Sequence, residues 1–127
     1  EIGILTFTST IWENQVSYAL GLDSNDVVIA ISNSGESSQV LAVCKEMKKR
    51  GVPTIGITNN EDSVVAKECV YHIQTSTREK LFLNEFCFSR ISAATVIEIL
   101  YLFLTNANDD SYNRISQCEE LYASLKV

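Results

Sequence analysis

The sequence predicts an α/β domain built on a parallel sheet, and two observations carry that prediction. Short apolar runs alternate with segments of helical periodicity along the first half of the chain. The strongest run, residues 27–31, is apolar throughout, which is typical of a strand covered on both faces in a parallel sheet. A strand, a helix and a second strand in succession then place the two strands parallel with a right-handed crossover.

The elements before this unit are weaker. Residues 2–7 (IGILTF) form a short apolar, partly β-branched run that predicts an edge strand. Residues 14–22 predict a brief helix that ends at the turn GLDSND. The strand 27–31 follows this turn.

A helix is predicted from Gly35 to Arg50. Its apolar residues fall on one face, and three cations occupy its last turn, where they suit the negative end of the helix dipole. Gly51 and Pro53 then mark its end. Residues 54–58 (TIGIT) predict the second strand.

The second half continues the alternation. Ser63 is expected to cap a short helix that runs to about Cys69, and residues 70–73 predict another strand. After a polar segment, 74–80, a long helix is predicted over 83–104. A last amphipathic helix is predicted over 112–125.

Composition limits the classes of function. The 127 residues fit one domain, and 46% hydrophobic content predicts a packed core. Sixteen acidic residues against ten basic ones give a net charge of −6, so this part of the protein is not expected to hold DNA by charge. The longest apolar stretch, 93–104, is shorter than the roughly 20 residues of a membrane span and contains Glu98, so no membrane partner is predicted.

The chain has four cysteines, and their spacing is wide and irregular. Because no CxxC pair occurs, the sequence predicts neither a zinc site nor a redox dithiol, and no metal or other cofactor is expected. Reduced thiols and the lack of a secretory signal lead us to expect a cytoplasmic protein. The four are Cys44, Cys69, Cys87 and Cys118.

The segment that follows the strand 27–31 is the most informative one for function. It places three hydroxyls, an amide and a glycine at the carboxyl end of a strand and the start of a helix, where ligands bind in open parallel sheets. Free N–H groups at a helix N-terminus favour an anion such as phosphate, although serines here can also merely cap the helix. No lysine completes a nucleotide-binding loop. These residues are Ser32, Asn33, Ser34, Gly35 and Ser37.

The stretch VVIAISNSGESSQVLAVCKEMKKRGVPTIGITNNEDSVVAK resembles the core of a SIS (sugar isomerase) domain. Further on, FCFSRIS (86–92) is similar to the sensor domains of RpiR-type bacterial transcription regulators. The resemblance implies a three-layer α/β/α sandwich of flavodoxin-like type that binds a phosphorylated sugar.

Carried over by position, the resemblance also implies roles for single residues. Ser32, Asn33, Ser34 and Ser37 match positions that contact the phosphate, and Gly35 matches the turn residue. Secondary ligand-binding candidates on a nearby wall are Thr58, Asn59 and Ser63.

The sequence departs from the family pattern at its start. A SIS domain usually begins with a helix and a strand that ends in a further Gly- and Ser-rich loop, and no such segment is present. We therefore expect residues 1–127 to be a SIS domain cut from a longer chain with a helix-turn-helix domain upstream. A neighbouring element or partner is expected to cover the exposed sheet edge.

Three functional hypotheses remain at this point. Isomerisation of a sugar phosphate needs a base, and the candidates are few: Glu79 and Glu85 are weak ones, while His72 and Glu36 are better explained by packing and by the helix dipole, and Arg90 by an ion pair. The preferred hypothesis is a non-catalytic sensor of sugar phosphates in a transcription regulator. The alternatives are an isomerase or lyase subunit and a SIS fold used only for dimerisation.

The expected partners follow from the same features. The ligand is a phosphorylated sugar, and DNA is contacted only through the upstream domain. The segment 93–104 is apolar on nearly all sides, which suits a core or a subunit interface, so a homodimer or higher oligomer is expected.

Overall fold

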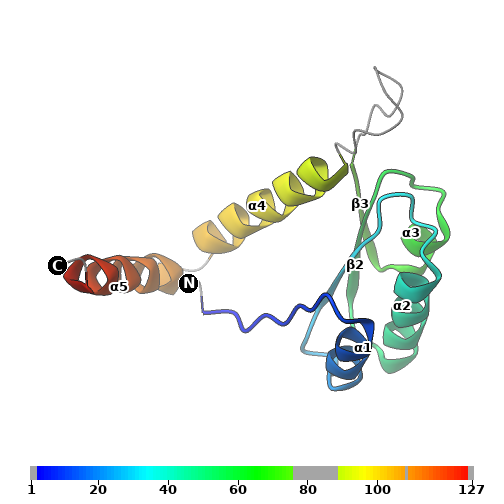
Figure 1. Cartoon of the computed structure of the whole chain (residues 1–127), viewed down its shortest axis with the longest axis horizontal. Coiled ribbons are helices and arrows are strands. Elements are labelled where there is room, and N and C mark those ends of the chain that lie inside the picture. The colour runs from blue at the N-terminus through cyan, green and yellow to red at the C-terminus, as the bar shows by residue number, and fades with distance from the viewer. Residues whose placement is uncertain (1–2, 76–88, 108, 126–127) are drawn as a thin grey trace, which may run out of the picture. The chain divides into compact units, whose positions relative to one another are not determined.

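The computed structural model describes residues 3–75, 89–107 and 109–125 (Figure 1). The chain divides into two compact units, one formed by Thr8–Ala94 and the other by Glu1–Phe7 together with Thr95–Val127. The sheet and all the candidate site residues that the structure describes belong to the unit Thr8–Ala94.

Three strands form the described sheet, in the spatial order β1-β2-β3. Both pairings are parallel, with Val28 opposite Thr54 and Ile55 opposite Tyr71. The predicted parallel sheet is therefore confirmed, and the strand 54–58 has the predicted bounds. The strands are β1 (Val28–Ile31), β2 (Thr54–Thr58) and β3 (Tyr71–Gln74).

Three helices accompany this sheet: α1 (Trp12–Leu20), α2 (Ser38–Arg50) and α3 (Val64–Glu68). The predicted apolar face of α2 is buried through Cys44 and Met47. Met47 packs with Ala19 and Val52 in one core cluster, and Cys44 packs with Ala30 and Val65 in another. Helix α2 ends as predicted, because Gly51 adopts a left-handed conformation (φ +71°) that closes the last turn.

The described residues bury one face of β1. Val28 and Ala30 contact the core clusters that α2 completes, whereas Ile29 and Ile31 are 43% and 48% exposed. Alternate residues of a strand point to opposite faces, so burial of the second face needs elements other than α1–α3. The uniformly apolar character of 27–31 thus marks a strand built for two covered faces, of which this unit covers one.

The predicted edge strand at 2–7 is wrong for the residues that the structure describes. Residues 3–7 form no strand, and none of the three described strands pairs with them. Ile4, Leu5 and Phe7 are 56%, 81% and 59% exposed. Apolar composition alone does not form a strand, because its backbone N–H and C=O groups need a paired neighbour.

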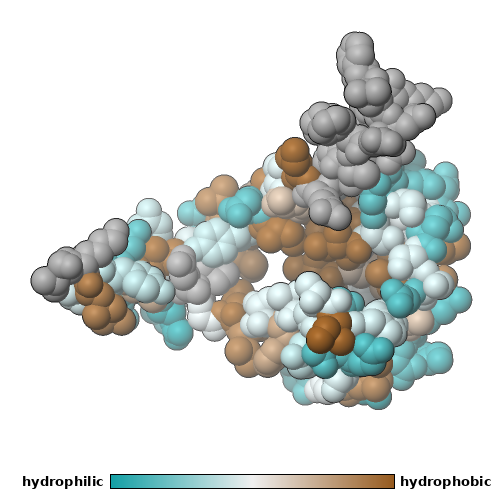
Figure 2. All heavy atoms as spheres, viewed as in Figure 1, coloured by the Kyte–Doolittle hydropathy of each residue, from teal (hydrophilic) through white to brown (hydrophobic). Residues whose placement is uncertain are grey.

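Two longer helices end the chain, α4 (Ser89–Ala107) and α5 (Asp109–Leu125). They confirm the two predicted helices, although residues 83–88 of the first lie outside the described residues and the second begins three residues earlier than predicted. Large apolar side chains of α4 are exposed, among them Leu102 (58%) and Phe103 (69%). Figure 2 shows such apolar residues at the surface among hydrophilic ones.

No single helix in the described parts of the chain is long and apolar enough to span a membrane. The segments Ile91–Ala107 and Asp110–Leu125 meet the length and composition criteria only as a pair, and the pair is bent by 107°.

Candidate functional site

Two loops follow parallel strands at the same edge of the sheet. The first loop, residues 32–37, joins β1 to α2, and the second loop, residues 59–63, joins β2 to α3. The carboxyl edge of an open parallel sheet is where such folds bind ligands.

A tight turn shapes the first loop. The N–H of Ser32 donates to the carbonyl of Ile57 on β2 (3.0 Å), and the N–H of Gly35 donates back to the carbonyl of Ser32 (3.0 Å). Gly35 has φ +72°, a conformation that L side chains rarely adopt, and a Cβ there would collide with the side chain of Ser63. Only glycine fits this position.

Helix α2 begins three residues later than the sequence predicted. The positive φ of Gly35 cannot belong to a right-handed helix, so the helix starts at Ser38 and Ser37 becomes its N-cap. The Oγ of Ser37 accepts from the N–H of Val40 (3.5 Å). Ser34 is exposed in the turn before the cap, and its Oγ accepts from the N–H of Glu36 (3.3 Å).

Backbone hydrogen bonds tie the two loops together. The N–H of Asn59 donates to the carbonyl of Asn33 (2.8 Å), and the N–H of Val65 donates to the carbonyl of Gly35 (3.0 Å). From the end of β3, the N–H of Thr75 donates to the carbonyl of Thr58 (2.7 Å). The first loop is therefore held in one shape from both sides.

The hydroxyl of Thr58 is fully used inside the domain. Its Oγ1 lies 2.8 Å from the carbonyl oxygen of Asn60, 3.1 Å from the N–H of Asn60 and 2.9 Å from Nε2 of His72. A carbonyl only accepts, so the single hydroxyl proton goes to it, and we assign His72 as an Nε2–H donor. Thr58 is completely buried. These contacts give both Thr58 and His72 structural roles.

Ser63 is the N-cap of α3. Its Oγ accepts from the N–H of Ala66 (3.3 Å), and the residue is 1% exposed. Its side chain lies directly against Gly35. The second loop thus presents Ser63 to the first loop rather than to solvent.

The first loop keeps polar groups that the domain does not consume. Among the described residues, no hydrogen bond engages the hydroxyl of Ser32 or the N–H groups of Ser38 and Gln39. These N–H groups belong to the first turn of α2, where the helix dipole is positive. The cations of α2 (Lys48, Lys49, Arg50) lie at its other end. Hydroxyls and N–H donors around a helix N-terminus form an anion site.

The remaining candidates are not drawn into this arrangement by the described residues. Glu36 is exposed beside the first loop. Glu79 and Glu85 lie outside the described residues, as does the side chain of Arg90. Within the described residues, no three His, Cys, Asp or Glu side chains are grouped so that they could hold a metal ion.

Sequence reasoning missed two features of this edge. One is the contact between Thr58 and His72, and the other is the backbone bond between Asn59 and Asn33. Both depend on which residues of neighbouring strands lie side by side. The pairing of Gly56 with His72 on β3 would have indicated the first of them.

Comparisons with known proteins agree with this geometry. A family model described as the SIS domain matches residues 9–103. An uncharacterized HTH-type transcriptional regulator of Caldanaerobacter subterraneus subsp. tengcongensis is 27% identical over 114 residues, and one of Thermotoga maritima is 26% identical over 102 residues. The matches cover 89% and 80% of this chain but 40% and 36% of those regulators.

Three solved structures share the fold. The Vibrio vulnificus NanR protein complexed with ManNAc-6P has a TM-score of 0.82 at 18% identity, over 99% of this chain and 48% of NanR. The sugar isomerase domain of an RpiR transcription factor from Sphaerobacter thermophilus has a TM-score of 0.65 at 16% identity, covering 91% and 61%. An Escherichia coli CFT073 protein in complex with a sugar phosphate has a TM-score of 0.63 at 28% identity, covering 83% and 59%.

These matches show that a SIS fold surrounds the two loops. The first two structures are too distant in sequence to indicate more than the fold. The chain also spans less than two thirds of each relative, so their activities belong to longer proteins. Because the family model matches most of the chain, from the start of α1 into α4, this chain belongs to the SIS domain family.

Proposed function

We propose that this chain is the effector-binding domain of an RpiR-type transcription regulator, and that it binds a phosphorylated sugar without converting it. In this proposal the chain folds within a longer cytoplasmic protein, and DNA is contacted by a helix-turn-helix domain outside residues 1–127. A homodimer or higher oligomer would present two such effector sites.

The observation that carries the proposal is the geometry of the first loop. Hydroxyls of Ser32, Ser34 and Ser37 surround the N-terminus of α2, where the N–H groups of Ser38 and Gln39 have no partner among the described residues. Donors of this kind, with a positive helix end, suit a phosphate dianion without a lysine or arginine. The bonds to Ile57 and Asn59 hold these donors in place before a ligand arrives.

The comparisons support the ligand class and the biological role. Two structural relatives are complexes with phosphorylated sugars, ManNAc-6P in NanR and a different sugar phosphate in the E. coli protein. The curated relatives are HTH-type transcriptional regulators. A domain that binds a sugar phosphate and biases DNA binding in a neighbouring domain fits both facts.

We assign two kinds of role within the site. Ser32, Ser34 and Ser37 contact the phosphate directly, together with the first N–H groups of α2. Asn33 and Gly35 shape the turn, while Thr58, Asn59 and Ser63 position it, because their bonds and contacts run to other parts of the domain.

The absence of catalysis is also a proposal, and the environment of His72 supports it. Nε2 of His72 is bonded to the buried hydroxyl of Thr58, so this nitrogen is engaged away from the first loop. If the protein is instead an isomerase or lyase, its base would have to come from Glu79 or Glu85.

A binding experiment with a product assay tests the proposal. The purified protein is titrated by calorimetry and by thermal shift with a panel of hexose, N-acetylhexosamine and pentose phosphates, each beside its unphosphorylated sugar. One phosphorylated sugar at about 100 times its Kd should add roughly 2.7 kcal/mol to stability, a shift in Tm of several degrees. The same mixtures are followed by NMR. Conversion at enzyme-like rates would establish the isomerase, and equal binding of the unphosphorylated sugars would overturn the phosphate site.

A further inference from the structure

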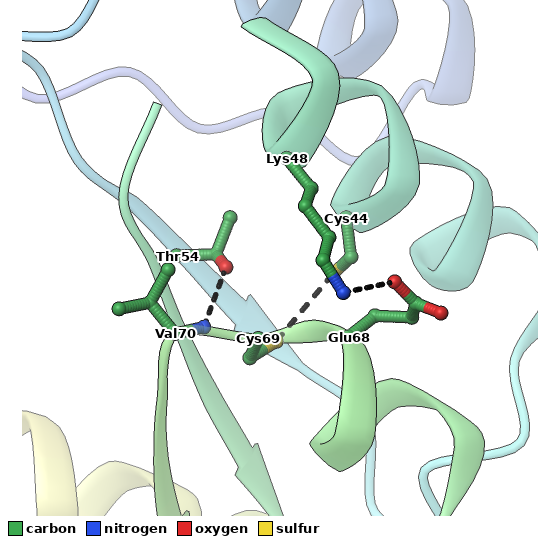
Figure 3. Close-up of polar contacts among 6 residues, drawn as sticks. All are labelled: Cys44, Lys48, Thr54, Glu68, Cys69 and Val70. Carbon is green, nitrogen blue, oxygen red and sulfur yellow. Dashed lines mark hydrogen bonds and ion pairs between the residues drawn. The ribbon is translucent and has the colours of Figure 1, made fainter. Parts of the chain in front are cut away.

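Two cysteines that are 25 positions apart in the sequence meet in the core. Cys44 projects from α2, Cys69 follows the end of α3, and their Sγ atoms are 3.7 Å apart and hydrogen-bonded (Figure 3). Cys44 is completely buried, whereas Cys69 is partly exposed. One thiol is therefore open to a small reagent, and the other lies directly behind it.

The surroundings hold the two sulfurs at this separation. Beside them, Lys48 of α2 and Glu68 of α3 form an ion pair (3.1 Å) that links the same two helices (Figure 3). The sulfur of Cys69 also lies close to the backbone of β2, since a Cβ added at Gly56 would be only 2.9 Å from it. The glycine makes the room that lets Cys69 approach Cys44.

The two thiols differ in acidity. The thiol of Cys44 and the hydroxyl of Thr54 hydrogen-bond to the sulfur of Cys69, and together they lower the pKa of Cys69 to about 7, although burial and the charge of Glu68 oppose this. The hydrogen bond to Cys69 and burial raise the pKa of Cys44. Cys69 is thus the thiol that ionises, and Cys44 keeps its proton.

We propose that Cys44 and Cys69 form a redox site, in which a hydroperoxide oxidises the pair to a disulfide that joins α2 to the end of α3. The thiolate of Cys69 attacks one oxygen of hydrogen peroxide, the O–O bond breaks, and a sulfenic acid forms with release of hydroxide. Cys44 then loses its proton, and its sulfur displaces the hydroxyl group from Cys69 as water. Two thiols are oxidised by two electrons, and one peroxide is reduced to two waters.

The motion that this step needs is small. A disulfide bond is about 2.0 Å long, so the sulfurs must approach by roughly 1.7 Å, within reach of side-chain rotation and a slight shift of α3. The sequence predicted no redox dithiol because it contains no CxxC pair, but the fold places the two thiols together. The inference does not depend on the phosphate site.

The test uses a background in which Cys87 and Cys118 are replaced by serine. The folded protein is treated with hydrogen peroxide, remaining thiols are blocked with N-ethylmaleimide, and a tryptic digest is analysed without reduction. Cleavage after Lys45 and Lys67 separates the two cysteines. We expect one cross-linked peptide pair, lost on reduction, and a Tm several degrees higher for the oxidised protein, since the link restricts the unfolded chain.

Single variants provide the controls. Cys44→Ala should abolish the cross-link and leave Cys69 as sulfenic or sulfinic acid, and Cys69→Ser gives a second test if loss of the buried thiol impairs folding. Peroxide treatment that converts Cys69 to sulfinic acid in the two-cysteine background, with no cross-link to Cys44, would overturn the proposal. So would a cross-link that forms only between two copies of the chain.

Discussion

The first and second loops follow the same plan in sequence and differ in how they use their polar groups. Each comes after a parallel strand and ends in a serine that caps a helix, Ser37 for α2 and Ser63 for α3. In the second loop Ser63 is 1% exposed and is packed against the first loop, and the hydroxyl of Thr58 just before it makes three internal contacts. The first loop leaves Ser34 exposed and the first N–H groups of α2 without a partner among the described residues.

This difference separates a loop that supports from a loop that binds. Buried polar groups have to be satisfied, so the second loop spends its donors and acceptors within the fold. A loop whose donors point to solvent at a helix N-terminus keeps them for a ligand. The two loops therefore predict opposite patterns of stability and affinity when they are mutated.

The largest expected effect concerns the contact between the loops. Gly35→Ala places a Cβ against the side chain of Ser63 in a left-handed conformation. We expect a loss of roughly 2–5 kcal/mol in the free energy of unfolding, from backbone strain and overpacking together. Gly51→Ala is the matched control, because Gly51 has nearly the same φ (+71°) with no atom within 4 Å of an added Cβ, and it should lose only roughly 1 kcal/mol. Urea unfolding measures both, and equal losses would contradict the steric argument.

The next effect is on affinity and tests Ser34. Ser34→Ala should weaken sugar-phosphate binding about ten- to a hundredfold, since a hydrogen bond to a charged group contributes roughly 1.5–3 kcal/mol. Ser34→Asp should abolish binding, because a carboxylate would then face the phosphate. Neither variant should alter stability much, as Ser34 is exposed and Ser37 provides the helix cap. Calorimetry measures affinity, and unchanged binding by the Asp variant would show that the phosphate is held elsewhere.

Thr58→Val should give the reverse pattern. The substitution keeps the shape of the side chain but deprives the N–H of Asn60 and Nε2 of His72 of their acceptor. We expect roughly 1–3 kcal/mol less stability, the typical cost of unsatisfied buried groups. Affinity of the folded variant should change less than twofold. A Thr58→Val variant that is fully stable but binds weakly would identify the Thr58 hydroxyl as a ligand contact.

Much of the fold could be predicted because its signals are local. Residues 54–58 read as a strand from their own composition, and Gly51 marked the end of α2 through its chain position. The failure at residues 3–7 has a different origin, since pairing depends on a neighbouring strand that composition does not reveal. The start of α2 was placed three residues too early because the positive φ of Gly35 arises from its contact with Ser63, a residue distant in sequence.

The candidate site divides along the same line. The cluster of hydroxyls in residues 32–37 and its place after β1 could be inferred from the sequence alone. Which serine caps the helix could not, and neither could the internal use of Thr58 or the meeting of Cys44 with Cys69. These features depend on strand register and helix packing, which join residues 14 to 25 positions apart.

The smallest expected effect compares the two caps directly. Ser37→Ala and Ser63→Ala each remove an oxygen that accepts an N–H bond in the first turn of a helix, at 3.5 Å and 3.3 Å. Each should lower the free energy of unfolding by about 1 kcal/mol, measured by thermal and urea unfolding. Their affinities should differ: Ser37→Ala also loses a phosphate contact and should bind several times more weakly, whereas Ser63→Ala should bind like the parent. Ser37→Asp and Ser63→Asp sharpen the comparison, because aspartate restores either cap. At Ser37 the added carboxylate would still repel the phosphate, so stability should recover while binding is lost. Recovery of both properties in Ser37→Asp would mean that Ser37 serves the helix alone, as Ser63 does.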